Sequence, residues 1–424
     1  MYKFIRRASQ SDLIKGSFVV FLGQNFGNLG QFLYNLSIAR ILGPSLYGDF
    51  GAILSVSALF SAPLSVLSLM ATKNASSFFG KGESGKIAWY TREIIRKGLL
   101  ISFFGFIVFL LTLPWLSKFL QIQSVLPLVV LIGSVFLAVP LTIYRSVLRG
   151  ILLFNEVSIN SGIETYIKLL VTLLFIFVGW GLFGTALAIP ISSITVLVLI
   201  LIPFKKAFGQ ISMKKSVSDR VSKGFFPIMA ITFCFTSFYT SDIILVRHFF
   251  DSTTAGQYVV LSTVGKIILF LIGPVVSVMF PLVTVRREKG EAYLIPLLGT
   301  LVISLLAASV ITLVYFLFPG FIISFFFGQK YLSIVPYLGI YAIFTSIYTL
   351  NNVLMNFFLS ISDYRLFPLL VLSSFSQIVF IFFFHRTISD VISVNIISSI
   401  IFFSFSIIYL LYKEKQIIFK LVNK

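Results

Sequence analysis

Long apolar runs separated by short polar breaks are the feature that most constrains this 424-residue chain. Residues 101–113, for example, contain no charged side chain. Only 11% of the residues are charged, the mean hydropathy is +1.02, and Phe alone contributes 49 residues. A soluble protein has about 25% charged residues, which it needs to cover its surface. The sequence therefore predicts an all-α polytopic membrane protein and excludes a soluble enzyme.

Apolar windows of about 20 residues are long enough to cross the hydrocarbon core of a bilayer as helices. They predict twelve transmembrane helices in two six-helix lobes. The first six spans are 16–39, 48–72, 98–117, 125–147, 159–180 and 182–203, and the second six are 225–248, 256–283, 293–318, 331–359, 364–384 and 391–412. The corresponding domains are an N-terminal lobe at 1–203, a basic linker at 204–223 and a C-terminal lobe at 224–424.

Basic residues predict the orientation of these helices. The side that carries both termini holds 26 Lys and Arg residues, whereas the opposite side holds 5. Loops rich in Lys and Arg stay in the cytoplasm, so both termini are predicted to be cytoplasmic. The net charge of +19 is explained by topology, and nucleic acid is not an expected partner. The longest loops, 73–97 and 204–223, are too short to fold as catalytic domains, so an enzyme is not expected.

An internal repeat relates the two lobes. An offset of 207 residues maps Asn35 onto Asp242, Arg40 onto Arg247, and Arg149 onto Asn356. Gly48 maps onto Gly256 only with an offset of 208, so the second turn holds one extra residue. Because six is an even number of spans, both lobes are predicted to have the same orientation, related by a pseudo-two-fold axis along the membrane normal. Chance similarity between short apolar segments is the alternative.

The turn after the first span reads Arg40-Ile-Leu42-Gly-Pro44, followed by Tyr47-Gly-Asp-Phe50. This pattern resembles the polysaccharide-exporter family of oligosaccharide-lipid flippases, the Wzx-type O-antigen transporters. The family belongs to the MOP superfamily, so the resemblance implies a fold like that of the multidrug-and-toxin exporters (MATE). The chain departs from many relatives at 67–70, where it has Leu-Ser-Leu-Met and they have Asp-x-Gly.

The resemblance also implies a function. It suggests a secondary transporter of the cytoplasmic (inner) membrane that moves a polyprenyl-pyrophosphate-linked oligosaccharide to the outer leaflet by alternating access, without a cofactor. Membrane lipids and other polysaccharide-assembly proteins would be its partners. A cation-coupled multidrug exporter of the same fold and a membrane-embedded enzyme of glycan assembly are the alternatives. An exporter of organic cations should carry carboxylates in its cleft, and such an enzyme usually needs a large extracytoplasmic loop.

Polar residues at helical spacing inside a span should face protein or water, because exposing them to lipid is costly. Two such stripes are candidate sugar-contacting walls. They comprise Gln24, Asn28, Gln31 and Asn35 in the first span, and Tyr337, Tyr341, Tyr348 and Asn352 in the tenth. Hydrogen bonding between packed helices is the alternative explanation for both stripes.

Charged residues inside a span suggest a functional site. Lys168 and Lys266 lie deep in the fifth and eighth spans and are candidates for binding the substrate pyrophosphate. Glu164, one turn before Lys168, forms either a salt bridge with that lysine or an ion-coupling site. Asp242 is the second candidate for ion coupling and a potential partner of Lys266.

Arg145 and Arg149 share a helix face at the predicted cytoplasmic mouth, with no acidic residue between them in the sequence. This arrangement predicts a site for an anion such as pyrophosphate. Anchors that only set the topology are the alternative.

Two motifs do not indicate the sites that they resemble. Residues 80–87 match a nucleotide-binding P-loop except at Ile87, which cannot bind magnesium, and they follow a membrane helix where a P-loop follows a strand. No nucleotide is therefore expected. His248 and His385 lie in separate turns, and Cys234 is the single cysteine, so no metal site is expected.

Overall fold

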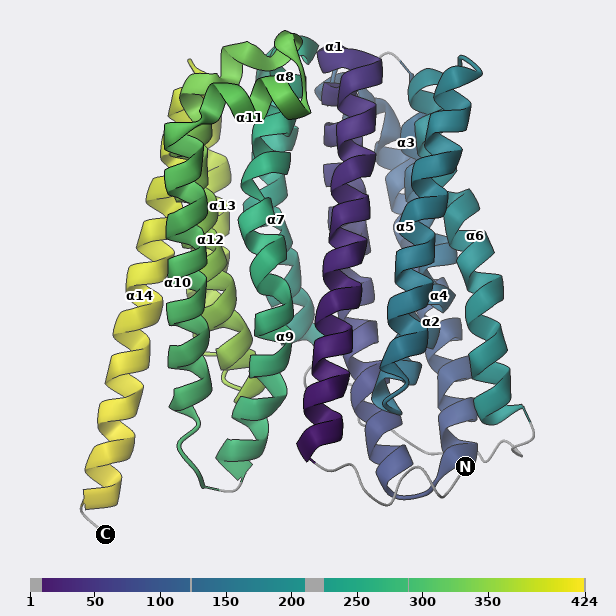
Figure 1. The fold of residues 1–424 in the computed structure, drawn as a ribbon, viewed down its shortest axis with the longest axis vertical. Coiled ribbons are helices and arrows are strands. Elements are labelled where there is room, and N and C mark those ends of the chain that lie inside the picture. The colour runs from purple at the N-terminus through teal and green to yellow at the C-terminus, as the bar shows by residue number, and fades with distance from the viewer. Residues whose placement is uncertain (1–9, 123, 210–224, 289, 423–424) are drawn as a thin grey trace. The chain divides into compact units, whose positions relative to one another are not determined.

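The computed structural model describes residues 10–122, 124–209, 225–288 and 290–422 (Figure 1). These residues form helices and turns, with no β-strand among them. The chain divides into two compact units, Met1–Phe233 and Cys234–Lys424. Most of the linker predicted at 204–223 lies outside the described residues.

The helices of the first unit follow one another with short turns. They are α1 (Gln10–Gly80), α2 (Ser84–Phe119), α3 (Leu126–Gly133), α4 (Val135–Gly150), α5 (Phe154–Phe177) and α6 (Gly181–Phe208). Helix α7 (Phe225–Phe249) contains the boundary between the units. The second unit continues with α8 (Ser252–Gly265), α9 (Ile267–Glu288), α10 (Leu294–Leu317), α11 (Pro319–Phe326), the 3₁₀ helix η2 (Gln329–Ile334), α12 (Val335–Ser360), α13 (Phe367–Phe383) and α14 (Ile388–Val422).

All twelve predicted spans have a counterpart among these helices. Within the described residues, ten helical segments are long and apolar enough to cross a membrane, counting α3–α4, α8–α9 and η2–α12 as one each. Helix α1 contains the first two predicted spans, and the eleventh corresponds to the shorter apolar helix α13. The chain is therefore a multi-pass integral membrane protein.

Helix α1 folds back on itself at Gly43, where the backbone is not helical (φ 79°, ψ 176°). In a straight helix Tyr34 and Phe50 would lie about 24 Å apart at 1.5 Å per residue. Their ring centroids are instead 6.1 Å apart. A positive φ suits glycine, and Pro44 then begins the second leg with its fixed φ. The predicted turn between the first two spans is thus confirmed, although the break in the helix is only one residue long.

The second unit contains a matching hairpin between α7 and α8. Asp251 caps the start of α8 by accepting hydrogen bonds from the backbone N–H groups of Thr253 (3.0 Å) and Thr254 (3.1 Å). Across this turn the Tyr258 hydroxyl donates to Asp242 at 2.7 Å. Asp242 and Tyr258 are 208 residues beyond Tyr34 and Phe50, the pair that meets across the first hairpin.

This correspondence corrects the predicted register by one residue. At an offset of 208, Asp242 matches Tyr34 and not Asn35, and Arg247 matches Ala39 and not Arg40. Burial agrees with the new register, because Ala39 and Arg247 are both buried whereas Arg40 is exposed. Because both contacts join residues 16 positions apart, the two hairpins have the same length and the predicted extra residue in the second turn is wrong.

A second correction concerns the turns that end α4 and α12. In both turns three successive backbone N–H groups bond back to the helix in the same pattern, from 151–153 in the first unit and from 361–363 in the second. The middle residue has a positive φ in each case, Leu152 at 67° and Ser362 at 53°. The offset here is 210, so the predicted match of Arg149 with Asn356 is wrong.

The predicted cytoplasmic loop at 73–97 is also shorter than expected. Helix α1 continues to Gly80 and α2 begins at Ser84, so three residues connect the two helices. The helix ends are held together by a hydrogen bond of 2.7 Å from Asn74 to the Tyr90 hydroxyl. The basic residues of this segment therefore do not end either helix.

Apolar side chains form a core inside each unit. One cluster in the first unit includes Leu67, Val139 and Val147, and one in the second includes Met279 and Phe357. Other apolar residues remain on the outer surface, as at Leu111 in α2, which is 77% exposed. Such an apolar surface suits contact with lipid.

Candidate functional site

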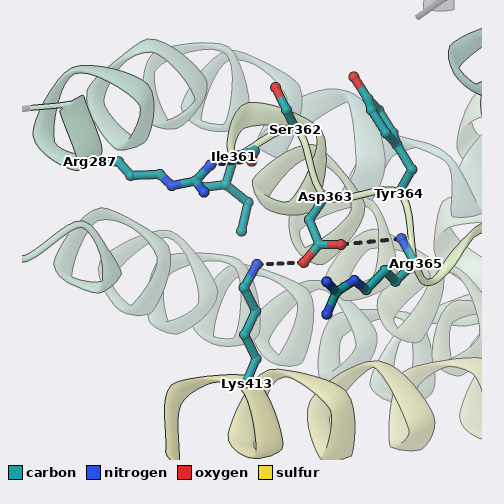
Figure 2. A pocket seen from close by; sticks show the side chains of 7 residues that line it. All are labelled: Arg287, Ile361, Ser362, Asp363, Tyr364, Arg365 and Lys413. Carbon is teal, nitrogen blue, oxygen red and sulfur yellow. Dashed lines mark hydrogen bonds and ion pairs between the residues drawn. The ribbon is translucent and has the colours of Figure 1, made fainter. Parts of the chain in front are cut away.

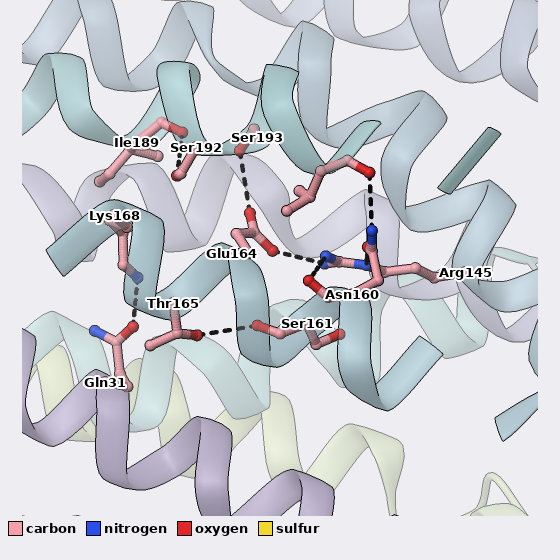
Figure 3. A network of polar contacts seen from close by, with 11 residues as sticks. Gln31, Arg145, Asn160, Ser161, Glu164, Thr165, Lys168, Ile189, Ser192 and Ser193 are labelled. Carbon is pink, nitrogen blue, oxygen red and sulfur yellow. Dashed lines mark hydrogen bonds and ion pairs between the residues drawn. The ribbon is translucent and has the colours of Figure 1, made fainter. Parts of the chain in front are cut away.

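Helix α5 brings the polar residues of the first unit together. Asn160, Glu164 and Lys168 follow one another at intervals of four residues, so they form a stripe along one side of the helix. The side chains of this stripe reach α4, α6 and α1, as Figure 3 shows. One helix therefore presents an amide, a carboxylate and an ammonium group to three neighbours.

Arg145 of α4 is held at the first half of this stripe. Its Nη1 donates to Glu164 Oε2 at 2.7 Å, and its Nε donates to Asn160 Oδ1 at 2.8 Å (Figure 3). The other Glu164 oxygen accepts a hydrogen bond from Ser193 of α6 at 3.1 Å, and Asn160 donates to the Val196 carbonyl at 2.9 Å. The network connects three helices through an arginine that is only 12% exposed.

The network corrects one prediction. Arg145 has an acidic partner, because Glu164 comes from the next helix, 19 positions along the chain. Glu164 forms its ion pair with Arg145, and its charge also acts on Lys168 one turn further along α5. Arg149, one turn after Arg145, is exposed at the end of α4. The two arginines therefore have different environments.

Lys168 occupies the far end of the stripe. Its Nζ donates to Gln31 Oε1 of α1 at 2.5 Å and lies 4.5 Å from the centroid of the Tyr34 ring (Figure 3). An amide oxygen and an aromatic face both stabilise a cation without neutralising its charge. Lys168 therefore remains a source of positive potential inside the first unit.

The predicted polar stripe of the first span contributes to this arrangement in part. Gln31 binds Lys168, and Asn35 donates to the Gln31 carbonyl at 3.0 Å. Asn28 is partly buried, and the side chain of Gln24 lies outside the described residues. The contacts of Gln31 and Asn35 are thus hydrogen bonds within and between packed helices, which was the alternative explanation for this stripe.

Asp242 of α7 is the centre of the polar network in the second unit. The carboxylate is fully buried, and its Oδ2 accepts hydrogen bonds from Tyr258 (2.7 Å), Tyr341 (3.3 Å) and Asn395 (3.2 Å). Its Oδ1 accepts from the backbone N–H of Ile243 at 2.8 Å. Four donors from helices α7, α8, α12 and α14 surround this carboxylate.

A second layer extends the network. Gln377 of α13 donates to Asn395 Oδ1 at 2.6 Å and to the Phe238 carbonyl at 3.0 Å. Gln377 and Asn395 are completely buried. Sequence analysis missed both residues, as it missed Asn160, because their hydrogen-bond partners lie on other helices. The four-residue spacing of Asn160, Glu164 and Lys168 is the signal that could have found Asn160.

Lys266 lies at the break between α8 and α9. Its Nζ is 4.9 Å from the centroid of the Tyr239 ring, and its charge interacts with that of Asp242. Asp242 as a partner of Lys266 stays a prediction, which this charge interaction supports. Each unit thus contains one lysine over a tyrosine ring.

The predicted tyrosine stripe of α12 is largely inside the second unit. Tyr341 and Tyr348 are 0% and 3% exposed, and their hydroxyls donate to Asp242 and to the Phe235 carbonyl. The interpretation of these two residues as a hydrated wall is therefore wrong. Tyr337 and Asn352 are partly exposed and stay candidates.

No group of three or more metal-ligating side chains occurs in the part of the chain that the structure describes. The charged groups of the two networks are Asp, Glu, Lys and Arg side chains surrounded by amides and hydroxyls. Such groups can bind anions and exchange protons.

A comparison with protein-family models identifies the family of this chain. Residues 13–285, more than half of the chain, match the model described as polysaccharide biosynthesis protein. The chain belongs to this family. A comparison with curated proteins finds no match.

Solved structures show the fold of this polysaccharide biosynthesis protein. One described as an inward-facing multidrug resistance MATE family transporter of the MOP superfamily aligns over 94% of this chain and 99% of that chain, with a TM-score of 0.75 and 14% identity. A MATE protein in complex with MaL6 aligns over 95% and 97%, with a TM-score of 0.68 and 15% identity.

A third similar structure is a MOP superfamily transporter from Pyrococcus furiosus, described as having a binding pocket of reverse polarity that suggests a different function. It aligns over 93% of this chain and 95% of that chain, with a TM-score of 0.64 and 15% identity. At these identities the likeness establishes the fold alone. The MATE-like fold expected from the sequence is confirmed.

Proposed function

We propose that this polysaccharide biosynthesis protein is a secondary transporter that moves a polyprenyl-pyrophosphate-linked oligosaccharide across the cytoplasmic membrane. The observation that carries the proposal is the match of residues 13–285 to a polysaccharide biosynthesis family in a chain with a MATE-like fold. A saccharide on a lipid carrier is a substrate that a membrane protein of polysaccharide synthesis has to handle.

The charges support an anionic substrate. Lys168 donates to an amide oxygen, and both Lys168 and Lys266 lie over tyrosine rings, so these contacts do not neutralise the two positive charges. Lys266 also interacts with the charge of Asp242. Arg149 is exposed at the predicted cytoplasmic end of α4 and is the candidate for first contact with the pyrophosphate. Arg145 serves as a positioning residue for Glu164.

The partly exposed polar residues are candidates for contact with the sugars. They are Asn28, Gln31, Asn35, Tyr337 and Asn352. Sugar hydroxyls both donate and accept hydrogen bonds, which amide and phenol groups can match. The polyprenyl tail would stay in the bilayer, because apolar chains gain nothing by leaving it.

Glu164 and Asp242 are the candidates for coupling to an ion gradient. Asp242 fits this role because it is a buried carboxylate whose charge interacts with Lys266. Protonation of the carboxylate would free Lys266 to bind a substrate anion. The proposed transporter would then link proton or cation movement to substrate release.

A cation-coupled multidrug exporter is the second candidate function, because the similar solved structures include multidrug resistance transporters. Substrate charge distinguishes the two functions. An exporter of organic cations binds cations through carboxylates, whereas Arg145 and Ser193 already bind Glu164 here and four donors surround Asp242.

Binding to the purified protein tests the proposal. Polyprenyl-pyrophosphate-linked oligosaccharide should bind, and tetraphenylphosphonium, an organic cation, should not compete with it. Arg149→Lys should weaken binding about three-fold or more, because lysine lacks the planar fork that matches phosphate. Arg40→Lys, on the predicted opposite side, is the control. Binding of tetraphenylphosphonium in place of the lipid-linked oligosaccharide would favour the drug exporter.

A further inference from the structure

A pocket of about 590 Å³ opens among three helix ends of the second unit (Figure 2). Arg287 comes from the end of α9, residues 361–365 form the turn between α12 and α13, and Lys413 comes from α14. All lining residues belong to the second unit. None of them is a candidate for the proposed transport site.

The pocket contains three cations and one carboxylate. Asp363 Oδ2 accepts hydrogen bonds from Lys413 Nζ (2.5 Å) and the Tyr409 hydroxyl (2.9 Å), and its Oδ1 accepts from the backbone N–H of Arg365 (3.2 Å). The lysine and the carboxylate are therefore paired. Two guanidinium groups, of Arg287 and Arg365, give the pocket its net positive charge.

Both arginines have hydrogen-bonding capacity left for a ligand. Arg287 donates from Nη1 to the Ile361 carbonyl, which fixes its side chain at the rim of the pocket. A guanidinium carries five N–H donors, so one such contact uses a small part of them. Arg365 is exposed beside the paired Asp363 and Lys413 (Figure 2).

The first unit provides an internal comparison. Its equivalent turn has the same backbone hydrogen bonds and the same positive φ at the second residue. The side chains there are Leu152, Leu153, Phe154 and Asn155, in place of Ser362, Asp363, Tyr364 and Arg365. The polar and charged groups of the second turn are therefore not needed to form the turn.

The pocket also lies next to the ends of two helices. Helices α9 and α12 end at Glu288 and Ser360, adjacent to the lining residues Arg287 and Ile361. The distribution of basic residues predicts that this end is cytoplasmic, and the cytoplasmic leaflet is rich in anionic lipids. Basic pockets between helices at this level suit phosphate headgroups.

We propose that Arg287 and Arg365, beside the Asp363–Lys413 pair, bind the phosphate of an anionic lipid headgroup at the cytoplasmic surface of the second unit. Two guanidinium groups match the oxygens of a phosphate through charge-assisted hydrogen bonds. This site goes beyond the proposed function, because a structural lipid can bind here whether or not the protein transports a substrate.

Lipid binding to the purified full-length chain tests the site. Native mass spectrometry with phosphatidylglycerol should show binding about five-fold weaker for Arg287→Gln and for Arg365→Gln, equivalent to the roughly 1 kcal/mol per basic residue near an anionic surface. Arg286→Gln is the matched control, because Arg286 is the neighbouring arginine of α9, does not line the pocket and contacts the Ala292 carbonyl at 3.4 Å. Thermal unfolding in the same detergent checks that each variant is folded.

Two further probes identify the source of the phosphate. If inorganic pyrophosphate competes with phosphatidylglycerol, the phosphate is the recognised group. If the two variants weaken only the binding of polyprenyl pyrophosphate, the site binds the lipid carrier of the proposed substrate. Unchanged binding of both lipids in Arg287→Gln and Arg365→Gln would overturn the proposal. An equal loss in Arg286→Gln would also overturn it, because nonspecific surface attraction would then explain the binding.

Discussion

The charged residues of the two polar networks have contacts on helices other than their own. Arg145 meets Glu164 across α4 and α5, Lys168 meets Gln31 of α1, and Asp242 collects donors from α8, α12 and α14. In hydrocarbon an unpaired charge is costly, so partners on neighbouring helices fix how the helices pack. Polar residues therefore determine both how the helices pack and the electrostatic potential inside each unit.

The Arg145–Glu164 pair should contribute to stability as a unit. Arg145→Gln and Glu164→Gln each leave one partly buried charge without its partner, so each should destabilise the protein by about 2 kcal/mol. The double variant should be destabilised by less than the sum, because it leaves no unpaired charge. Thermal unfolding of the four proteins in detergent measures this coupling. Additive effects would show that the pair contributes little.

Asp363 gives a pH dependence outside the spans. Partial burial opposes its ionisation, but hydrogen bonds from Lys413 and Tyr409 outweigh this and lower the pKa of the carboxyl below its ordinary 3.8. A carboxyl with a lowered folded-state pKa stabilises the protein above its unfolded pKa, and this contribution disappears as the pH falls through the folded value. The Tm difference between wild type and Asp363→Asn should therefore be largest near neutral pH and shrink below about pH 4.

Asp390→Asn controls for the general effect of removing a carboxylate. Asp390 caps a turn through Thr387 and has no lysine partner among the described contacts. A Tm difference for Asp363→Asn that stays constant down to pH 3 would contradict the role of the Lys413 contact.

Among the elements, hairpins at the ends of long helices set the architecture. The α1 and α7–α8 hairpins bring together residues that are 16 positions apart, by ring contact in one unit and by a hydrogen bond in the other. Hydropathy predicted the spans because lipid demands apolar length, and Leu42-Gly43-Pro44 predicted the first turn. The register of the repeat could be determined only from contacts in the structure, because the sequences of apolar helices resemble one another at many offsets.

Close packing between elements makes a specific prediction at Gly150, the last residue of α4. A Cβ at this position would lie 2.7 Å from the Thr72 carbonyl oxygen and 2.9 Å from the Ala75 Cβ. Gly150→Val should therefore push α4 away from α1 and cost about 1–3 kcal/mol. Gly105→Ala in α2 is the control, because a Cβ there meets no atom within 4 Å. Equal Tm values for both variants would contradict the packing.

For the whole molecule, the sequence predicted the fold class well and the site in part. The apolar spans and the Arg40–Phe50 motif led to a two-lobed MATE-like membrane protein, which the family match and the solved structures support. The deep lysines could be found from the sequence because charge within a span is rare. Their partners could not, because Gln31 and Lys168 are separated by 137 positions. The pocket at Arg287 combines three distant segments for the same reason.

The most direct test of the proposed transport is translocation in proteoliposomes. Purified protein should move polyprenyl-pyrophosphate-linked oligosaccharide between leaflets without ATP. Lys266→Ala should be folded and inserted but slower by about ten-fold, because the variant loses a cation that the proposal assigns to the substrate phosphate. Wild-type protein that leaves the lipid-linked oligosaccharide in its original leaflet, or Lys266→Ala that transports it at the wild-type rate, would contradict the account.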